Sequence, residues 1–219
     1  MRTFAQEINR ALEDAIKKDN SVLVGGQLVK YGVAGLTKGL FDKYPDQFIT
    51  YPVAESLMNS SAMGLALAGK RVVMIHVRID FLASGMCALV NHIPVWFHKG
   101  FDLPITFVCQ VGKGMGQGAQ HSKDLSPWFK KFQGWTVLTP ETPAMAYEMM
   151  TESIFGNKPV LYVIHRELFD AKRPKKVPKL DDVRLCGASR RHERVFYGFD
   201  HDVSFYGDDT EYSEDDRTI

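Results

Sequence analysis

Short apolar runs alternate with segments of helical periodicity along most of this chain, and that alternation limits the fold more than any other feature. The apolar runs predict buried strands at 21–25, 48–51, 72–77, 104–109, 135–138 and 159–164. The segments around them predict helices at 4–18, 33–43, 54–68, 82–98, 124–131 and 142–155. This order is typical of an α/β fold, a three-layer sandwich whose mostly parallel sheet is covered by helices on both faces. Ligands of such sheets bind beyond the carboxyl ends of the strands.

Two of the predicted helices have informative surfaces. Thr3 and Gln6 have the spacing of a capping box, and an apolar residue then recurs every fourth position to Ile16, which predicts an amphipathic helix that ends near Lys18. Residues 54–68 instead carry Ala, Ser, Met and Leu on every side. That distribution predicts a fully enclosed helix.

Composition narrows the class of protein. Hydrophobic residues make up 45% of the chain, charged residues 24%, and the formal net charge is +1. No excess of charge therefore favours a nucleic acid or an anionic membrane as a partner, and no apolar stretch has the length of a membrane span. The three cysteines lie far apart and the histidines are scattered, which predicts neither disulfides nor a metal site. We expect a cytoplasmic protein, because the N-terminus has a helix start in place of a signal peptide.

The composition changes after residue 171, so we expect three regions. Residues 1–171 form the α/β domain. Residues 172–180 alternate lysine or arginine with proline and predict an extended linker. Residues 181–219 lack periodicity and end in an acidic run, which predicts a tail that is disordered or docked on a partner.

Glu55 is the first candidate functional residue. It follows a predicted strand and begins the helix of small and apolar residues. One interpretation is structural, since a carboxylate at a helix N-terminus is stabilised by the helix dipole. The other is functional, because the end of a strand is where an α/β protein places a catalytic acid or base.

Several motifs together resemble one family. They are the segment from Tyr51-Pro-Val-Ala-Glu-Ser to Gly69, Gly35-Leu-Thr-Lys-Gly-Leu-Phe-Asp-Lys-Tyr, Gly118-Ala-Gln-His-Ser with Trp128-Phe129, Leu138-Thr-Pro-Glu-Thr-Pro, and Asn157-Lys-Pro-Val. In this order they resemble the pyrimidine-binding domain of thiamine diphosphate enzymes, most of all the beta subunit of the first component of 2-oxo acid dehydrogenase complexes. Transketolase contains a related domain. The resemblance covers roughly residues 3–169, which makes it more specific than any single glycine motif.

The resemblance implies roles for four residues. Glu55 matches the glutamate that bonds N1′ of the aminopyrimidine, which promotes loss of the thiazolium C2 proton. Phe81 matches the aromatic residue that stacks on that ring, and Val77 matches an apolar position beside it. His121, on the glycine-rich loop 112–119 and its continuation, matches a histidine at the substrate entrance that acts as an acid, a base or a substrate contact. Core packing for Phe81 and Val77, and a structural loop role for His121, are the alternatives.

The chain departs from the family at three places. Cys87-Ala88 replaces an Asp-Gln pair, and Gln27-Leu28 occurs where an acidic residue is common. The family's second α/β domain and its Gly-Asp-Gly signature for magnesium and diphosphate have no counterpart, since Gly207-Asp208-Asp209 lies in the acidic tail. We therefore expect the chain to bind thiamine diphosphate as its cofactor. The Mg²⁺ ion and the diphosphate group would both be held by another chain.

Together these observations predict a beta-type subunit of a thiamine diphosphate-dependent 2-oxo acid dehydrogenase, decarboxylase or transketolase-like enzyme. It would act on a small keto substrate, with an alpha-type partner subunit and as a homodimer within a heterotetramer. The alternative is a non-catalytic assembly or regulatory protein that retains the fold.

Overall fold

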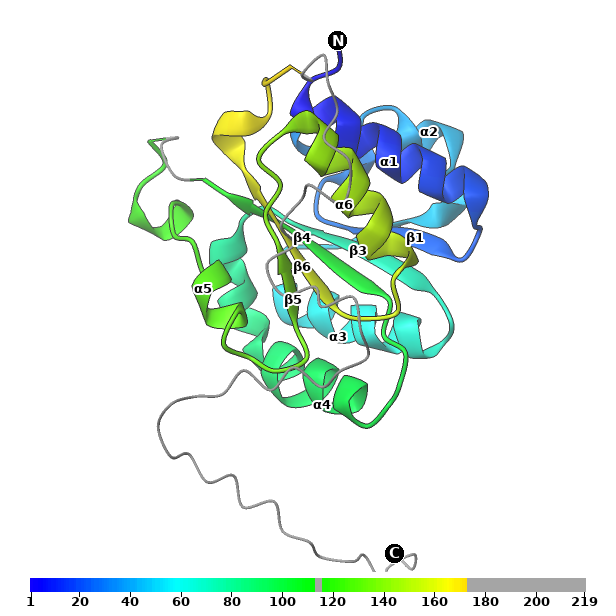
Figure 1. Ribbon diagram of the computed structural model, residues 1–219, viewed down its shortest axis with the longest axis vertical. Coiled ribbons are helices and arrows are strands. Elements are labelled where there is room, and N and C mark those ends of the chain that lie inside the picture. Colours follow the sequence, from blue (N-terminus) through cyan, green and yellow to red (C-terminus); the bar gives the residue numbers. More distant parts are fainter. Residues whose placement is uncertain (113–115, 173–219) are drawn as a thin grey trace, which may run out of the picture. The chain divides into compact units, whose positions relative to one another are not determined.

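The computed structural model describes residues 1–112 and 116–172, and within them six strands form one sheet of order β2-β1-β3-β4-β6-β5 (Figure 1). Every neighbouring pair of strands is parallel. The strands are β1 (Val22–Gly26), β2 (Phe48–Thr50), β3 (Arg71–His76), β4 (Ile105–Val111), β5 (Thr136–Leu138) and β6 (Val160–His165). The predicted α/β sandwich is confirmed.

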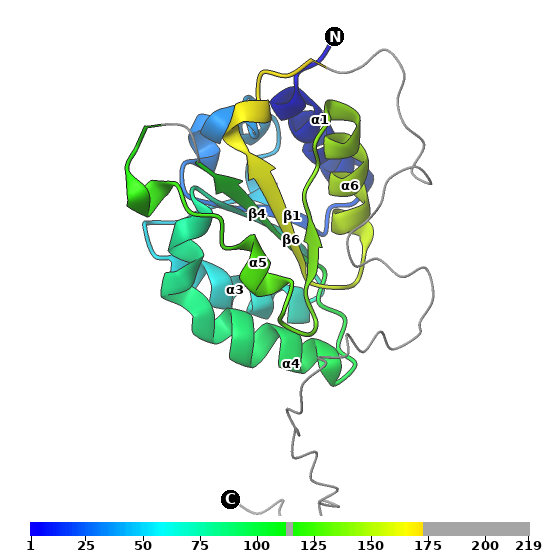
Figure 2. The same cartoon turned by 60° about the vertical axis from the view of Figure 1, so that its left-hand side comes forward.

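Helices cover both faces of this sheet. The α-helices are α1 (Phe4–Lys18), α2 (Leu40–Lys43), α3 (Glu55–Leu67), α4 (Ile93–His98), α5 (Ser126–Phe129) and α6 (Pro143–Phe155). The views of Figures 1 and 2 agree that α1 and α6 lie side by side on one face, whereas α3, α4 and α5 lie on the other. Shorter helical turns connect these elements, including η4 (Ile79–Gly85), the π-helix η5 (Ala88–His92) and η6 (Ala119–His121).

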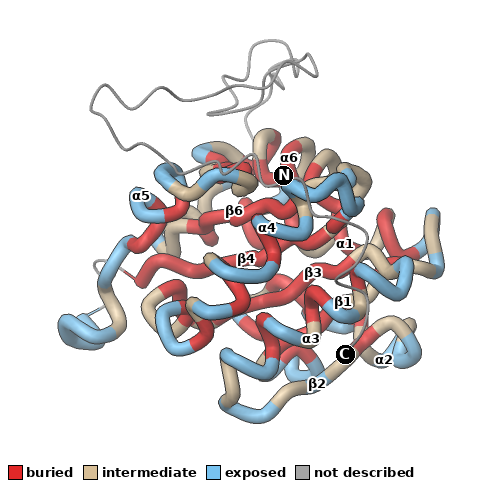
Figure 3. The backbone as a smooth tube through the Cα atoms, turned by 90° about the horizontal axis from the view of Figure 1, so that it is seen from below, coloured by how far each residue is buried: buried red, intermediate tan, exposed pale blue. Residues whose placement is uncertain are grey.

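The strands supply residues to two separate apolar cores because side chains alternate between the two faces of a sheet. In β3, Val73 and Ile75 join the core under α1 and α6, while Val72 and Met74 join the core under α3 and α4. Strands that are apolar on both sides are buried on both sides, as the red strands at the centre of Figure 3 show. This double burial explains the continuous apolar runs in the sequence.

The predicted boundaries of α1 are confirmed. The hydroxyl of Thr3 accepts a hydrogen bond from the backbone N–H of Gln6 at 3.3 Å, and the Gln6 side chain accepts one from the Thr3 N–H at 2.9 Å. Phe4, Ile8 and Leu12 are fully buried. The periodicity therefore located the buried face of this helix correctly.

The helix predicted at 33–43 is wrong in its first half. Only α2, at its end, is α-helical, and two short 3-10 turns and further turns precede it. Gly32, Gly35 and Gly39 have φ values of +75°, +80° and +73°. These left-handed conformations break a right-handed helix, and glycine adopts them without a steric penalty.

The long helix predicted at 82–98 is divided into three short segments of 3-10, π and α helix. They are η4, η5 and α4, and the two parts on either side of the break are bent by 75°. Pro94 has no N–H to donate to the preceding turn, which favours the wider π-helical turn before it. The helix predicted at 124–131 is likewise reduced to the single turn α5, whereas the strand predictions differ from the structure by no more than two residues at either end.

The prediction that residues 54–68 form a fully enclosed helix is wrong for one side of α3. Met58 and Ala62 are buried against the sheet, but Leu57 is 52% exposed and Leu67 is 41% exposed. Ser60 and Gly64 are exposed on the same side. The outer side of α3 is therefore uncharged, with two leucines open to solvent in the isolated chain.

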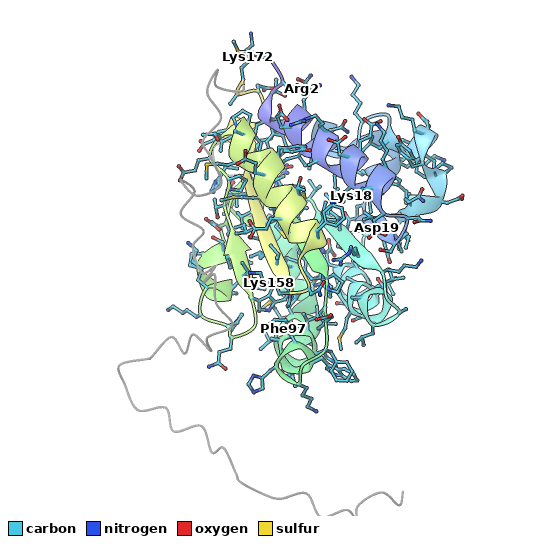
Figure 4. All side chains as sticks on the ribbon, turned by 45° about the vertical axis from the view of Figure 1, so that its right-hand side comes forward. Arg2, Lys18, Asp19, Phe97, Lys158 and Lys172 are labelled. Carbon is cyan, nitrogen blue, oxygen red and sulfur yellow. The ribbon has the colours of Figure 1, made fainter. Side chains whose placement is uncertain are left out.

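The two ends of the described residues meet. An antiparallel bridge pairs Thr3 with Lys172, and the Phe4 N–H donates to the Ala171 carbonyl at 2.8 Å. Figure 4 shows Arg2 and Lys172 together at this end, opposite the end that carries Phe97. The predicted linker beyond Lys172 and the predicted tail at 181–219 lie outside the described residues.

Among the residues that the structure describes, no single helix is long and apolar enough to cross a membrane. The bent pair Ile79–Gly85 and Ala88–His98 reaches that length and composition only when its two parts are counted together.

Candidate functional site

The carboxyl ends of β1, β2 and β3 form the place where the strand order reverses. Chain order runs from β1 outward to β2 on one side and then to β3 on the other. Gly26, the last residue of β1, pairs with Thr50 at the end of β2 and with Ile75 near the end of β3. Such a switch point is the preferred ligand site of an open α/β sheet.

Gly26 shapes the backbone at this point. Its φ is +148°, and a Cβ atom there would lie 2.5 Å from the carbonyl oxygen of Ile75. A side chain would therefore push β1 away from β3. The glycine lets the chain leave the sheet and place Gln27 directly over the switch point.

Glu55 lies at this edge as the first residue of α3. Its side chain is partly buried, and its Oε1 accepts a hydrogen bond from Gln27 Nε2 at 3.0 Å. Among the described residues, Oε2 has no hydrogen-bond partner. Ala54, which caps α3, has no side-chain hydrogen bond to the first turn. One oxygen of the carboxylate is therefore held by the protein, and the other is available to a ligand.

Gln27 is a site residue that sequence reasoning identified only as a departure from the family. Its contact with Glu55 joins residues 28 positions apart, so no local pattern could reveal it. An acidic side chain at this distance would repel the Glu55 carboxylate. The glutamine amide instead donates a hydrogen bond to it.

Phe81 and His121 contact each other directly. Their ring centroids are 5.3 Å apart with an interplanar angle of 76°, an edge-to-face arrangement. Both side chains are partly buried, and His121 Nδ1 is buried without a hydrogen-bond partner among the described residues. The structure therefore brings together two of the predicted site residues from the loops that follow β3 and β4.

The start of α3 and the end of η4 connect the two parts of the site. Ser56 donates a hydrogen bond from its hydroxyl to the Ser84 carbonyl at 2.7 Å, and the Ser84 hydroxyl donates to the Phe81 carbonyl at 2.9 Å. A Cβ atom on Gly85 would lie 2.3 Å from the amide nitrogen of Asn59. Close packing of the two helices at a glycine thus places Glu55 and Phe81 on adjoining elements.

Val77 directly follows β3. It is partly buried and packs against the apolar core on the side of α1 and α6. This contact agrees with the alternative of ordinary core packing, and its position next to a bound ring stays a prediction.

His76 lies just below the site at the end of β3. It is 2% exposed, its ring centroid is 5.6 Å from that of Phe107, and both ring nitrogens lack a hydrogen-bond partner among the described residues. Burial lowers the pKa of His76 to about 3, since the charged imidazolium loses its solvation there. The ring is therefore neutral at physiological pH. Sequence reasoning had treated it as an ordinary polar residue.

Within the described part of the chain, no three His, Cys, Asp or Glu side chains come together as metal ligands would. The polar groups of the site are a carboxylate, amides, a guanidinium group and an imidazole. This set can bind a heterocycle and exchange protons with it.

Residues 1–172 match the family model described as transketolase, pyrimidine binding domain. The subunit beta of acetoin:2,6-dichlorophenolindophenol oxidoreductase from Cupriavidus necator is 29% identical over 177 residues, covering 74% of this chain and 52% of that protein. The subunit beta of 3-methyl-2-oxobutanoate dehydrogenase from Mycobacterium tuberculosis is 32% identical over 185 residues, covering 78% of this chain and 53% of that protein.

Solved structures show the same fold. One described as a split gene transketolase, inactive beta4 tetramer, superposes with a TM-score of 0.64 at 16% identity and covers 82% of this chain and 55% of that one. The chain spans about half the length of the curated relatives it matches. The family match extends over nearly all described residues and includes the edge that carries Gln27, Glu55, Phe81 and His121. The chain therefore belongs to the transketolase pyrimidine-binding domain family.

Proposed function

We propose that this chain is a beta-type subunit that supplies the aminopyrimidine side of an inter-subunit thiamine diphosphate site. The observation that carries the proposal is the Glu55 carboxylate at the switch point, with Oε1 held by Gln27 and Oε2 without a partner among the described residues. A ring nitrogen that shares a proton with a carboxylate needs such an arrangement.

The residues at the sheet edge fit this cofactor. Glu55 offers a partly buried acceptor, and Phe81 offers a partly buried aromatic ring, which suits a flat heterocycle. When bound, thiamine diphosphate supplies a nucleophilic carbon and an electron sink for cleaving a bond next to a carbonyl group. Both functions belong to the thiazolium ring, whereas the chain's carboxylate and aromatic residues match the aminopyrimidine ring that assists proton removal from it.

Each residue then has a specific task. Glu55 shares a proton with the pyrimidine ring nitrogen, while Gln27 orients the carboxylate through its hydrogen bond. Phe81 stacks on the ring. His121, whose edge-to-face contact with Phe81 positions it at the same edge, holds or donates a proton at the substrate oxygen.

The diphosphate and Mg²⁺ would be held by another chain. Two relatives are named as beta subunits, which supports an alpha-type partner. The exposed apolar side of α3 supports contact with a further protein chain, including a second copy within a heterotetramer. The proposed substrate is a small 2-oxo acid, as the name of the 3-methyl-2-oxobutanoate dehydrogenase relative suggests, and the proposed reaction is its decarboxylation or the transfer of a two-carbon ketol unit.

Calorimetry with thiamine diphosphate and Mg²⁺ tests the proposal, on the full chain alone and with an alpha-type subunit. We expect binding with the partner. Glu55→Gln should retain the fold and abolish exchange of the cofactor's C2 proton with deuterium. Glu141→Gln, at an exposed position, is the matched control and should leave exchange unchanged.

The test also separates the alternative function. The exposed side of α3 is equally suited to a non-catalytic assembly or regulatory protein, which would form complexes without the cofactor. If thiamine diphosphate binds neither to the chain alone nor to the chain with an alpha-type subunit, the enzyme proposal is refuted and the assembly or regulatory function is favoured.

A further inference from the structure

Arg78 is a buried cation that forms no ion pair with another described residue. It lies two residues beyond β3 and is 8% exposed. Its Nη2 donates a hydrogen bond to Gln117 Oε1, whereas its Nε is buried without a partner among the described residues. None of the ion pairs between described residues includes Arg78. Its positive charge is therefore not balanced by a neighbouring carboxylate in the described part of the chain.

The nearest carboxylate in the sequence does not supply this balance. Asp80 Oδ1 accepts a hydrogen bond from the Lys123 backbone N–H at 3.0 Å, and Oδ2 is buried with no hydrogen-bond partner among the described residues. Arg78 and Asp80 thus lie in the same short segment without forming an ion pair. Burial of an unpaired charge costs free energy, so a folded chain that maintains one calls for a binding partner.

Arg78 borders the proposed active site. A Cβ atom on Gly112, directly after β4, would lie 2.8 Å from both Cδ and Nε of Arg78 and 2.4 Å from the carbonyl oxygen of His121. The absence of a side chain at Gly112 thus makes room for the arginine against the His121 segment. Phe81, in the same turn η4 that follows Arg78, contacts the His121 ring.

A second unpaired polar atom lies on the His121 segment, against which Arg78 packs. His121 Nδ1 is buried without a hydrogen-bond partner among the described residues, as is Arg78 Nε. An imidazole nitrogen that carries a proton, together with a guanidinium group, would present donors from the ends of two adjacent strands. Guanidinium groups bind carboxylates and phosphates because their planar donors match the oxygens of these anions.

We propose that Arg78 binds the anionic group of the substrate and so selects negatively charged substrates. The shared chemistry is an oxyanion, either the carboxylate of a 2-oxo acid or the phosphate of a phosphorylated sugar. The assignment to a substrate rests on the proposed function, whereas the binding of an anion at Arg78 does not.

Thermal melting and calorimetry of the full chain, without cofactor or partner, provide the test. The probes are pyruvate, its neutral amide, and inorganic phosphate at constant ionic strength. Pyruvate or phosphate should raise the melting temperature of the wild-type chain, and pyruvamide should not. Preference for pyruvate indicates a carboxylate substrate, and preference for phosphate indicates a phosphorylated one.

Arg78→Met should weaken binding of the preferred anion by at least about tenfold, because a charge-assisted hydrogen bond is lost. Its melting temperature without anion should equal or exceed that of the wild type, since an unpaired buried charge is removed. Arg78→Lys should recover part of the binding. Arg2→Met makes the same change of charge at an exposed position and should leave binding unchanged.

Two results would overturn the proposal. One is the absence of any anion response that depends on Arg78. The other is a large fall in the melting temperature of both Arg78 variants without anion, which would show a structural role. Because these measurements contain no thiamine diphosphate, loss of the proposed cofactor binding and loss of the anion site give separate signals.

Discussion

The helices on the two faces of the sheet differ in the surface that they turn outward. The outer side of α1 is charged and paired: Lys17 and Lys43 both contact Glu13 within 3.2 Å. The outer side of α3 carries no charge beyond Glu55, and Leu57 and Leu67 are exposed there beside Ser60. The outer side of α1 is therefore suited to contact with solvent. The outer side of α3 has the composition of a surface that another protein covers.

The N-termini of the helices differ in the same way. Thr3 caps α1 and Thr142 caps α6, each by accepting a hydrogen bond from the third residue of the helix. The start of α3 has no side-chain cap, and Glu55 and Ser56 occupy it instead. The N-termini of α1 and α6 are thus stabilised by side-chain caps, whereas the uncapped N-terminus of α3 leaves polar groups available at the site.

Core truncation should have the largest effect. Leu12→Ala in α1 removes a fully buried side chain and should lower the free energy of unfolding by about 2–5 kcal/mol. Leu67→Ala is the same chemical change on the exposed side of α3 and should cost far less. Urea unfolding of both variants measures the difference, and equal losses would refute the contrast between the faces.

Acid should weaken the face with α3 and α4 through His76, whose side chain points to that core beside Phe107. The folded imidazole has a pKa of about 3, below the unfolded value of 6.5, so the unfolded chain binds the proton first. Stability is therefore present above pH 6.5 and is lost as the pH falls toward 3. The loss between pH 6.5 and 5 should be about 2 kcal/mol.

Unfolding measured across this pH range tests the His76 prediction. His76→Leu should flatten the pH dependence, and His98→Leu, at an exposed position, should retain it. An unchanged slope in His76→Leu would show that other groups cause the acid sensitivity.

Removal of the α1 cap should have an intermediate effect. Thr3→Ala abolishes the hydrogen bond to the Gln6 N–H and should cost about 1 kcal/mol in the free energy of unfolding. Thr3→Ser retains the hydroxyl and should retain most of the stability. Chemical denaturation of the three proteins measures this, and a loss in Thr3→Ser equal to that in Thr3→Ala would contradict a capping role.

The smallest effect on stability, and the sharpest on assembly, should come from Leu57. Leu57→Ser should change the free energy of unfolding of the isolated chain by less than about 0.5 kcal/mol, because the side chain is 52% exposed. It should weaken association with a second copy or an alpha-type subunit in sedimentation experiments. Asp42→Ser, at an exposed position of α2, is the control. Equal association of both variants would show that α3 is not part of the interface.

Local sequence patterns were sufficient where one element determines its own structure. The capping box and four-residue periodicity of α1 depend on contacts within a single helix and its buried face, and both are confirmed. The segment at 33–43 was mispredicted because its apolar spacing is helical while Gly32 and Gly35 adopt left-handed conformations. Apolar spacing does not indicate which glycines will be needed for turns.

The candidate site also has features that the local sequence indicates and features that only the tertiary structure shows. Glu55 could be selected from the sequence since it follows a strand and starts a helix, and those two facts are local. The hydrogen bond from Gln27, the contact of Phe81 with His121 and the burial of Arg78 could not be selected, because each joins segments that are distant in the chain.

The sequence by itself determined the alternation of strands and helices, the parallel sheet and the edge at which a ligand would bind. These follow from the period of apolar residues and from the rule that parallel strands end at one edge. Only the tertiary structure decided which side of α3 stays open, which oxygen of Glu55 is held and which arginine is left without a counter-charge. These properties depend on packing between segments, and the free energy of burying a polar group depends on the neighbours that folding brings to it.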